Sequence, residues 1–298
     1  YGNESLFIFA LLPAAGENSS QLKNYMEVTK MSRIKPRTLS GFMELLPEEQ
    51  VYFEKMAEKL RQVYSLYGFT PLIEASEILL AKGGGGTEKQ IYRFTKGEHD
   101  LSLRFDLTVP LAKYVALNYG KLTFPFRRFQ IGKVYRGERA QRGRFREFYQ
   151  ADIDVIGDGS LDIINEAEIP GIIYRAFTKL GLRRFVIRIN KRKVLNGLFE
   201  ILGVGDRAGD IMRTIDKLEK IGRDKVFEIL TGDYSMEKDS ADRLLNLLSC
   251  NTDPIAALSE YKGQNEIFDQ GVNELETVAK YMSSFGVPEE NYKIDLTI

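Results

Sequence analysis

The sequence predicts an α+β fold, in which an antiparallel sheet is flanked by helices and carries a helical insertion subdomain. Residues 126–136 and 148–155 alternate polar and apolar side chains, as half-buried strands do, and the loop between them makes them a hairpin. Residues from Pro47 to Tyr67 instead repeat apolar side chains every three or four positions, the spacing of an amphipathic helix. Residues 206–281 are charged and helical in pattern, without strand alternation, which predicts the insertion.

The predicted hairpin carries unusual polar faces. On its second strand, Phe148, Gln150, Asp152 and Asp154 share one face, and apolar residues take the other. One face of the first strand carries Arg128, Gln130, Gly132, Val134 and Arg136. The connecting loop adds Glu138, Arg139, Arg142 and Arg144. A basic loop that leads into an acid-lined strand suits a ligand with phosphate at one end and an amine at the other, although a surface hairpin of mixed charge is the alternative.

The remaining elements follow from local signals. Pro47 favours the first turn of its helix and Gly68 its end, and Pro71 places the strand predicted at 69–73 at a sheet edge or an interface. Residues 101–109 alternate without interruption, which predicts a strand whose polar face holds Asp106 and Thr108. Helices are further expected at 113–117, 162–180 and from 193, and strands at 184–190 and 292–298.

Composition excludes several kinds of site. The chain has 42 basic and 42 acidic residues, so a nucleic-acid contact needs a local patch. A single cysteine, Cys250, excludes an internal disulfide and a cysteine zinc site and is typical of a reducing cytoplasm. The one histidine, His99, is expected on the surface, and no apolar run could span a membrane. Gly83 to Gly86 is not a P-loop; we expect a mobile lid over substrate or a flexible connector.

Several ordered motifs resemble one known family. GFMELLPEEQ with its helix and FTPLIE is similar to class II motif 1, and LRFDLTVPLAKYVA to a histidine-binding segment with Asp-Leu-Thr in place of Glu-Gly-Thr. YRGERAQRGRFREFYQADIDVIG is similar to motif 2, and INKRKVLNGL to the strand and helix that follow it. From about Ser32 onward, the chain therefore resembles the catalytic core of the histidyl-tRNA synthetases, which are class II aminoacyl-tRNA synthetases.

This resemblance implies a class II synthetase-type antiparallel sheet and a division of the chain into four parts. Residues 1–31 are expected to be an N-terminal extension, either an artefact upstream of a natural start or a genuine arm. Residues 32–205 would form the catalytic core with motifs 1 and 2, residues 206–281 the helical insertion subdomain, and residues 282–298 a return to the core. The resemblance also implies a cytoplasmic enzyme that forms a homodimer through the motif 1 region, without a membrane anchor.

The implied activity is ATP-dependent activation of histidine to histidyl-adenylate, followed by transfer to tRNA(His). The residues that match the ATP-binding positions are Arg136 for the α-phosphate, Glu138 for the adenine edge, Arg144 for the γ-phosphate and Phe148 for stacking on adenine. Arg136 would also be catalytic, since its guanidinium can stabilise charge at the α-phosphorus. The residues that match the histidine-binding positions are Asp106, Thr108, Gln150 and Asp154. Magnesium would be held through the ATP phosphates, without protein ligands of its own.

Some features depart from the family pattern or leave alternatives open. Asp106 is one methylene shorter than the usual Glu, and Asp154 could instead be a strand-end acid paired with a nearby arginine. The family's second histidine-specific segment, motif 3 and anticodon-binding domain do not occur in these residues, so we expect a fragment with weak ligand binding and poor aminoacylation. The alternatives are the regulatory subunit of ATP phosphoribosyltransferase and a synthetase-like domain that senses tRNA.

Overall fold

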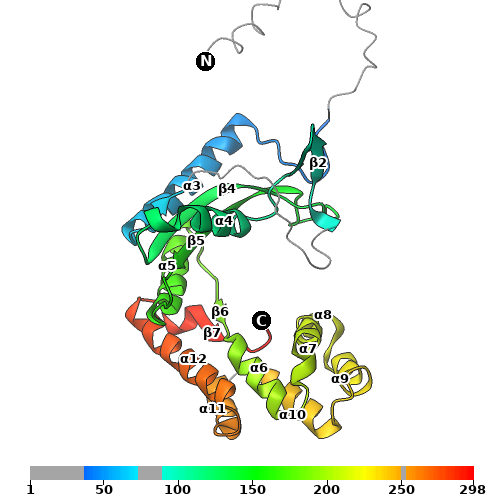
Figure 1. Ribbon diagram of the computed structural model, residues 1–298. Coiled ribbons are helices and arrows are strands. Elements are labelled where there is room, and N and C mark those ends of the chain that lie inside the picture. The colour runs from blue at the N-terminus through cyan, green and yellow to red at the C-terminus, as the bar shows by residue number, and fades with distance from the viewer. Residues whose placement is uncertain (1–36, 73–88, 250–252) are drawn as a thin grey trace, which may run out of the picture.

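The computed structural model describes residues 37–72, 89–249 and 253–298. The predicted N-terminal extension, the four-glycine segment and Cys250 lie outside the described residues. Figure 1 shows a part built around a sheet, with α3 and α4 against it, and a second part built of helices α6 to α12. Helix α5 leads from the first part to the second, and the C-terminal residues lie beside β6 and α6. The structure thus has the α+β character that the sequence predicts.

The bounds of the elements are close to the predicted ones for the long strands and helices. In chain order the sheet part contains α3 Pro47–Leu66, β1 Thr70–Pro71, β2 Arg93–Lys96, β3 His99–Ser102, α4 Thr108–Asn118, η2 Tyr119–Lys121, β4 Phe126–Tyr135, β5 Glu147–Ile156 and α5 Ile164–Leu180. The chain continues with β6 Ile187–Ile189, α6 Arg192–Ile201, η3 Gly205–Arg207, α7 Ala208–Ile215, α8 Leu218–Ile221, α9 Arg223–Gly232, α10 Lys238–Leu248, α11 Pro254–Leu258, η4 Ser259–Tyr261, α12 Glu266–Ser284, η5 Glu289–Asn291 and β7 Tyr292–Ile294.

The predicted hairpin is the centre of the main sheet. Strands β4 and β5 pair antiparallel over ten residues each, and β1 pairs parallel with β4 at Thr70 and Pro71. One face of this sheet packs against α3 and α5 through an apolar cluster of Val63, Tyr64, Phe69, Phe129, Ile172 and Ala176. The apolar alternation read from the sequence is what directs this face to the helices. The opposite face is the one that carries the predicted ligand residues.

The strand predicted at 184–190 shortens to β6 Ile187–Ile189, and two other predicted strands are wrong in extent for reasons that the structure shows. Residues 101–109 do not form one strand, because β3 ends at Ser102 and Thr108 begins helix α4. Asp106 explains the change: its Oδ1 accepts hydrogen bonds from the backbone N–H groups of Thr108 at 3.2 Å and Val109 at 2.9 Å, which satisfies donors that the first helical turn leaves unpaired. Pro110 also fits a first turn and would interrupt a strand.

The second error is at the C-terminal end of the described chain. Strand β7 ends at Ile294, although the pattern predicts a strand through Ile298. Asp295 turns the backbone, because its Oδ1 accepts hydrogen bonds from the backbone N–H of Thr297 at 3.0 Å and from its hydroxyl at 2.6 Å. Side chains of Asp that bond to the backbone two residues on favour turns over strands.

The helical part has a large apolar core of its own. It extends from Val194 and Leu198 on α6 to Phe268 and Leu275 on α12 and includes side chains of α7, α9 and α10. Two glycines bring α6 and α12 together: a Cβ on Gly197 would lie 2.4 Å from the backbone nitrogen of Phe268, and one on Gly271 would lie 2.7 Å from that of Val194. Among the described residues, no helix is both long and apolar enough to cross a membrane.

Candidate active site

The predicted polar faces of β4 and β5 lie on the same side of the sheet. The register pairs Arg128 with Asp154, Gln130 with Asp152, Gly132 with Gln150 and Val134 with Phe148. Residues at spacing two share a face, so these eight side-chain positions form one surface, as the sequence predicts. The β4 half of this surface is buried, since Arg128 and Val134 are 0% exposed and Gln130 is 5% exposed.

The segment between β3 and α4 covers this surface. The backbone carbonyl of Leu107 accepts a hydrogen bond from Arg128 at 3.2 Å, and that of Phe105 accepts one from Arg136 at 3.3 Å. The carbonyl of Arg104 accepts from the backbone N–H of Tyr135 at 2.8 Å. Asp106 and Thr108 are therefore carried over the sheet by a loop and a helix start, and not by a strand. Their predicted place on the polar face of a strand was wrong. Asp106 still lies close enough to this surface to raise the pKa of Asp152, whereas Thr108 is exposed.

Arg136 is held at the junction between the surface and the basic loop. Its guanidinium carbon lies 4.6 Å from the ring centre of Phe105 and 5.1 Å from that of Phe148. A guanidinium keeps its charge and its donors when it stacks between aromatic rings. The structure thus brings Arg136 and Phe148 together, as expected of two groups that contact one nucleotide, and it fixes the direction in which Arg136 presents its remaining N–H donors.

The loop between the two strands places Glu138 and Arg144 side by side. Nη1 of Arg144 lies 3.5 Å from Oε2 of Glu138, in a weak ion pair whose arginine is largely exposed. Arg146 fixes the loop from beneath by donating from Nε to the backbone carbonyl of Glu138 at 2.9 Å. Arg142 is exposed at the loop tip. All four predicted ATP-binding residues therefore lie at one end of the sheet surface.

Gln150 and Asp154 lie along the same surface, on the side away from the loop. Oε1 of Gln150 is buried and has no hydrogen-bond partner among the described residues, while its Nε2 lies 3.5 Å from Oδ1 of Asp152. A buried amide oxygen without a partner is costly, so such an atom points to a ligand that donates to it. Gly132, opposite Gln150, adds no side chain on that position.

Asp154 forms an ion pair with an arginine, which was the alternative to a ligand role in the sequence prediction. Its Oδ2 lies 2.7 Å from Nη2 of Arg128, whose side chain is fully buried. Burial raises the pKa of Asp154, and the charge of Arg128 opposes that shift. This contact leaves a ligand role for Asp154 as a prediction, because a carboxylate has lone pairs for more than one donor.

Asp152 and Arg128 both lie on the predicted polar faces, but neither is among the predicted site residues. Burial raises the pKa of Asp152; Asp154 and Asp106 add to the shift, whereas Arg128 and Arg136 oppose it. Asp152 therefore interacts electrostatically with residues at both ends of the surface. The two-residue periodicity was the signal that could have identified these two residues.

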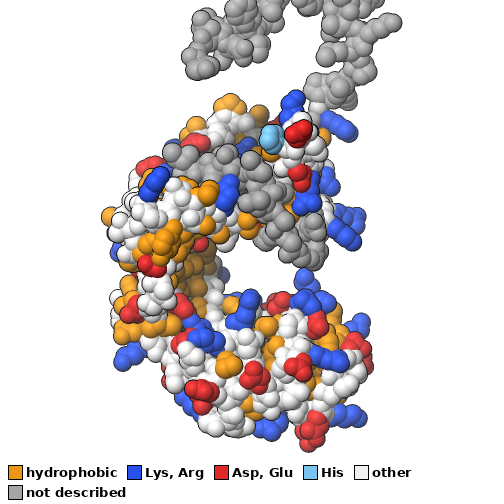
Figure 2. All heavy atoms as spheres, in the orientation of Figure 1, with side chains coloured by type: hydrophobic (Ala, Val, Ile, Leu, Met, Phe, Trp, Pro, Cys, Tyr) orange, Lys and Arg blue, Asp and Glu red, His pale blue; other side chains and the backbone are white. Residues whose placement is uncertain are grey.

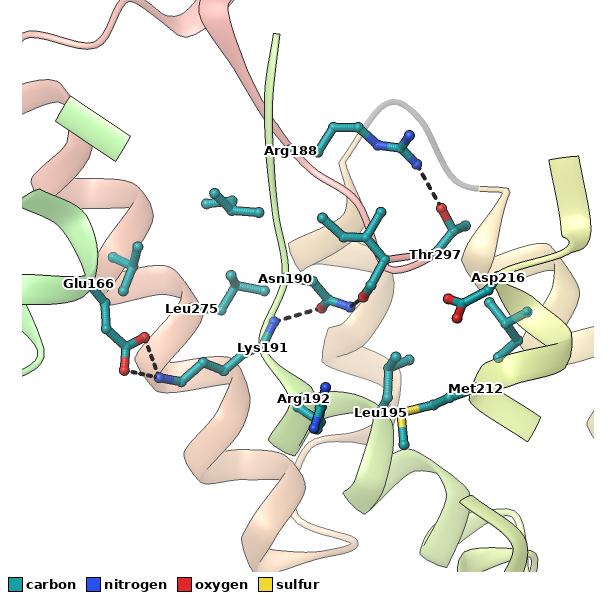
Figure 3. A pocket seen from close by; sticks show the side chains of 14 residues that line it. Glu166, Arg188, Asn190, Lys191, Arg192, Leu195, Met212, Asp216, Leu275 and Thr297 are labelled. Atoms are coloured by element: carbon teal, nitrogen blue, oxygen red, sulfur yellow. Dashed lines mark hydrogen bonds and ion pairs between the residues drawn. The ribbon is translucent and has the colours of Figure 1, made fainter. Parts of the chain in front are cut away.

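A cavity among the described residues lies away from this surface. Figure 3 shows this space of about 480 Å³ between β6, α6, α7 and α12, where Lys191 reaches Glu166 and Arg188 reaches Thr297. None of the predicted ATP- or histidine-binding residues lines it. Figure 2 shows a wider hollow between the sheet part and the helical part. His99 is exposed, as predicted, and no cluster of three metal-ligating side chains occurs in the described ranges.

Comparison with known proteins decides the family. Residues 41–298 match the model of the family described as histidyl-tRNA synthetase. The chain belongs to the histidyl-tRNA synthetase family. A histidine–tRNA ligase from Clostridium tetani is 56% identical over 276 residues, covering 90% of this chain and 62% of that protein. One from Finegoldia magna is 46% identical, with 89% and 63% covered. This chain thus spans less than two thirds of the length of these relatives.

Solved structures support the same family. A crystal structure of histidyl-tRNA synthetase from Nostoc sp. PCC 7120 matches with a TM-score of 0.79 and 37% identity, over 89% of this chain and 62% of that one. A protein from Bacillus halodurans, described as an ATP phosphoribosyltransferase regulatory subunit/histidyl-tRNA synthetase, matches with a TM-score of 0.72 at 22% identity. The second likeness shows the fold alone, so the regulatory alternative has less support than the synthetase family.

Proposed function

We propose that this chain provides the ATP- and histidine-binding surface of a histidine–tRNA ligase, which activates histidine to histidyl-adenylate and transfers it to tRNA(His). The observation that carries the proposal is the position of Arg136. It lies between Phe105 and Phe148, where the basic loop meets a surface lined with carboxylates. Here the phosphate of one substrate would meet the carboxylate of the other.

On the nucleotide side, each residue has a distinct task. Arg136 would donate to the α-phosphate and stabilise the extra negative charge of the pentavalent transition state, which is electrostatic catalysis without a protein nucleophile. Phe148 would stack on adenine, Glu138 would accept from the adenine amino group, and Arg144 would bind the γ-phosphate. The exposed side chain of Arg144 can leave its weak pair with Glu138 at little cost.

On the amino-acid side, the ligand carries an ammonium group and a neutral imidazole. Asp106 and Thr108 would contact the ammonium, and Gln150 and Asp154 the remainder of histidine. The buried Oε1 of Gln150 supports this, since it lacks a partner among the described residues and would gain one from a bound N–H group. The excess of carboxylates on this half of the surface also favours a cationic group.

Magnesium fits the site as a companion of ATP. When bound, it would offset charge on the pyrophosphate leaving group. Arg136 and Arg144 would hold the phosphate oxygens, and the phosphates themselves would hold the metal.

The partners follow from the same proposal. Helix α3 exposes Val51, Tyr52, Met56 and Leu66, an apolar set that suits a homodimer through the motif 1 region. The exposed Arg139 and Arg142 of the β4–β5 loop would contact tRNA(His). We place this activity in the cytoplasm, where protein synthesis uses it.

The test is ATP–pyrophosphate exchange in the presence and absence of histidine, together with calorimetric binding of ATP and of histidine to the chain. In a chain extended to the length of its relatives, Arg136→Gln should reduce exchange by about 10²-fold or more while thermal stability stays unchanged. Arg142→Gln, a matched change at the exposed loop tip, should leave exchange near the unmodified rate.

Two outcomes would count against the proposal. A chain that binds neither ATP nor histidine would contradict it directly. The regulatory-subunit alternative would be favoured if the chain bound the catalytic subunit of an ATP phosphoribosyltransferase and Arg136→Gln changed neither that binding nor the affinity for ATP.

A further inference from the structure

Arg128 has surroundings that are unusual for an arginine. Its side chain is fully buried on the central strand β4, toward the end of the surface that lies away from the β4–β5 loop. Nη2 lies 2.7 Å from Oδ2 of Asp154 on β5 and 3.2 Å from the backbone carbonyl of Leu107 in the covering segment. Nη1 lies 3.5 Å from Oε1 of Gln130 on its own strand. One guanidinium therefore contacts two strands and the loop that lies over them.

These contacts connect the two halves of the predicted histidine subsite. Leu107 stands between Asp106 and Thr108 in the sequence. The hydrogen bond from Arg128 to its carbonyl therefore restrains the distance between the backbone of these two neighbours and the sheet. The same guanidinium holds Asp154 across the strands. Nη2 makes both of these contacts, while Nη1 of the same planar guanidinium lies near Gln130, so the group is oriented on three sides; a lysine ammonium on a flexible stem would be oriented less firmly.

Charge supports a role beyond folding. Burial raises the pKa of Asp152, Asp154 and Asp106 add to this shift, and the fully buried Arg128 opposes it and also opposes the rise in the pKa of Asp154. Carboxylates that crowd one site destabilise one another unless a cation keeps them ionised. An ionised, correctly placed carboxylate is the acceptor that an ammonium or imidazole N–H requires.

We propose that Arg128 is a positioning residue for amino-acid binding: it fixes the spacing between Asp154 and the segment carrying Asp106 and Thr108, without contacting ATP. This rests on the function proposed above. Histidine affinity should depend on Arg128, and nucleotide affinity should not, because Arg136, Glu138 and Arg144 receive no contact from it among the described interactions.

Arg127 provides a matched control on the same strand. It points to the opposite face, where Nη2 lies 2.9 Å from both carboxylate oxygens of Glu168 and the guanidinium carbon lies 4.3 Å from the ring centre of Phe69. Arg127 and Arg128 are thus adjacent arginines in ion pairs, and only Arg128 faces the ligand surface. Loss of Arg127 should lower stability without changing the affinity for histidine.

The experiment measures binding of histidine and of ATP, separately, to the unmodified chain and to Arg128→Met, Arg128→Lys and Arg127→Met. Arg128→Met should weaken histidine about 10- to 100-fold and leave the ATP affinity within about twofold. Arg128→Lys keeps the charge and should recover part of the loss. In the Asp154→Asn variant, Arg128→Met should weaken histidine binding by a smaller factor than it does in the unmodified chain, because the two residues are coupled.

The outcomes separate this inference from the proposed function. If the unmodified chain binds neither ligand, both fail. If it binds both but Arg128→Met changes neither, or weakens both equally, the positioning role is overturned and the proposed function stands. If Arg128→Met does not fold by thermal unfolding and circular dichroism, Arg128→Lys decides: a change in histidine affinity alone supports the role, and unchanged or equally reduced affinities overturn it.

Discussion

The sheet part and the helical part of this chain bury different kinds of groups. The core of the helical part consists of aliphatic and aromatic side chains such as Leu198, Leu244 and Phe268. The sheet has a comparable apolar cluster only on the face that packs against α3 and α5, whereas its other face buries Arg128 and Gln130 beside carboxylates. Buried charge costs free energy unless it is paired: Arg128 is paired with Asp154 on this sheet face, and the buried Asp295, near the C-terminal end of the described chain, is paired with Arg188.

The largest effect should come from opening the apolar core. Phe268 is fully buried on α12, with its ring centre 6.1 Å from that of Tyr261. Phe268→Ala should lower the free energy of unfolding by about 3–5 kcal/mol, because it loses buried area and leaves a cavity. Denaturant unfolding measures this, and the histidine affinity of the folded protein should not change. A loss below about 1 kcal/mol would show that the helical part lacks the close-packed core described above.

A smaller loss should follow from adding one methyl group between α6 and α12. Gly197→Ala would place a Cβ within 2.6 Å of three atoms of Phe268, two of them backbone. The two helices would have to separate, at a cost of about 3 kcal/mol. Gly209→Ala is the matched control, since a Cβ there meets nothing within 4 Å on helix α7. It should raise stability slightly, so equal melting temperatures for the two variants would refute the close contact.

The next effect concerns Asp295, a buried acid that lies away from the predicted ligand surface, and its contribution to the free energy of unfolding. Burial raises the pKa of Asp295, but hydrogen bonds from Thr297 and Arg188 outweigh this and hold the pKa well below its usual range. Such an acid stabilises the fold above its unfolded pKa of about 3.9, and this contribution is lost as the pH falls toward the folded pKa. Asp295→Asn should therefore cost about 2 kcal/mol at pH 7. The difference from the unmodified protein should shrink steadily below about pH 4.

The smallest effect should have the opposite sign and lie on the ligand surface. The pKa of Asp152 is raised by burial, so the folded state binds a proton more tightly than the unfolded state does. Ionised Asp152 thus destabilises the fold at neutral pH, and this penalty is relieved as the pH falls below the folded pKa. Asp152→Asn should raise the free energy of unfolding by about 1 kcal/mol at pH 7 while weakening histidine binding. If Asp152→Asn instead lowered the free energy of unfolding, Asp152 would stabilise the fold as Asp295 does, and the expected difference between these two acids would be refuted.

Much of the fold could be predicted because long, strongly periodic segments determine it. The hairpin, helix α5 with its end at Gly181 and the helical character of 206–281 all follow from local patterns. The short strands could not be predicted as well. Residues 101–109 have a perfect strand alternation, yet Asp106 and Pro110 favour a helix start there. A side-chain hydrogen bond to the backbone outweighs periodicity when the strand has few partners.

The sequence could predict which side chains of the candidate site share a face of the sheet, but not which of them contact one another. Periodicity placed Gln150 and Asp154 on one face, and the register confirms that face. It could not show that Asp154 pairs with Arg128, because that contact depends on the alignment of two strands. The contact between Arg128 and the Leu107 carbonyl depends on a loop that the sequence pattern presents as a strand. The assignments of the eight site residues to ATP and histidine stay predictions.

The pairing of β6 with β7 has a consequence for the order of folding. These three-residue strands pair in parallel, and all residues between Ile189 and Tyr292 lie in the excursion that they close. Closing a flexible loop of roughly a hundred residues costs several kcal/mol of chain entropy, which a pair this short cannot offset. We therefore expect the helices to assemble first through contacts near in sequence, bringing the strand ends together. The pairing of β6 with β7 would then form late, after the helices between them have assembled.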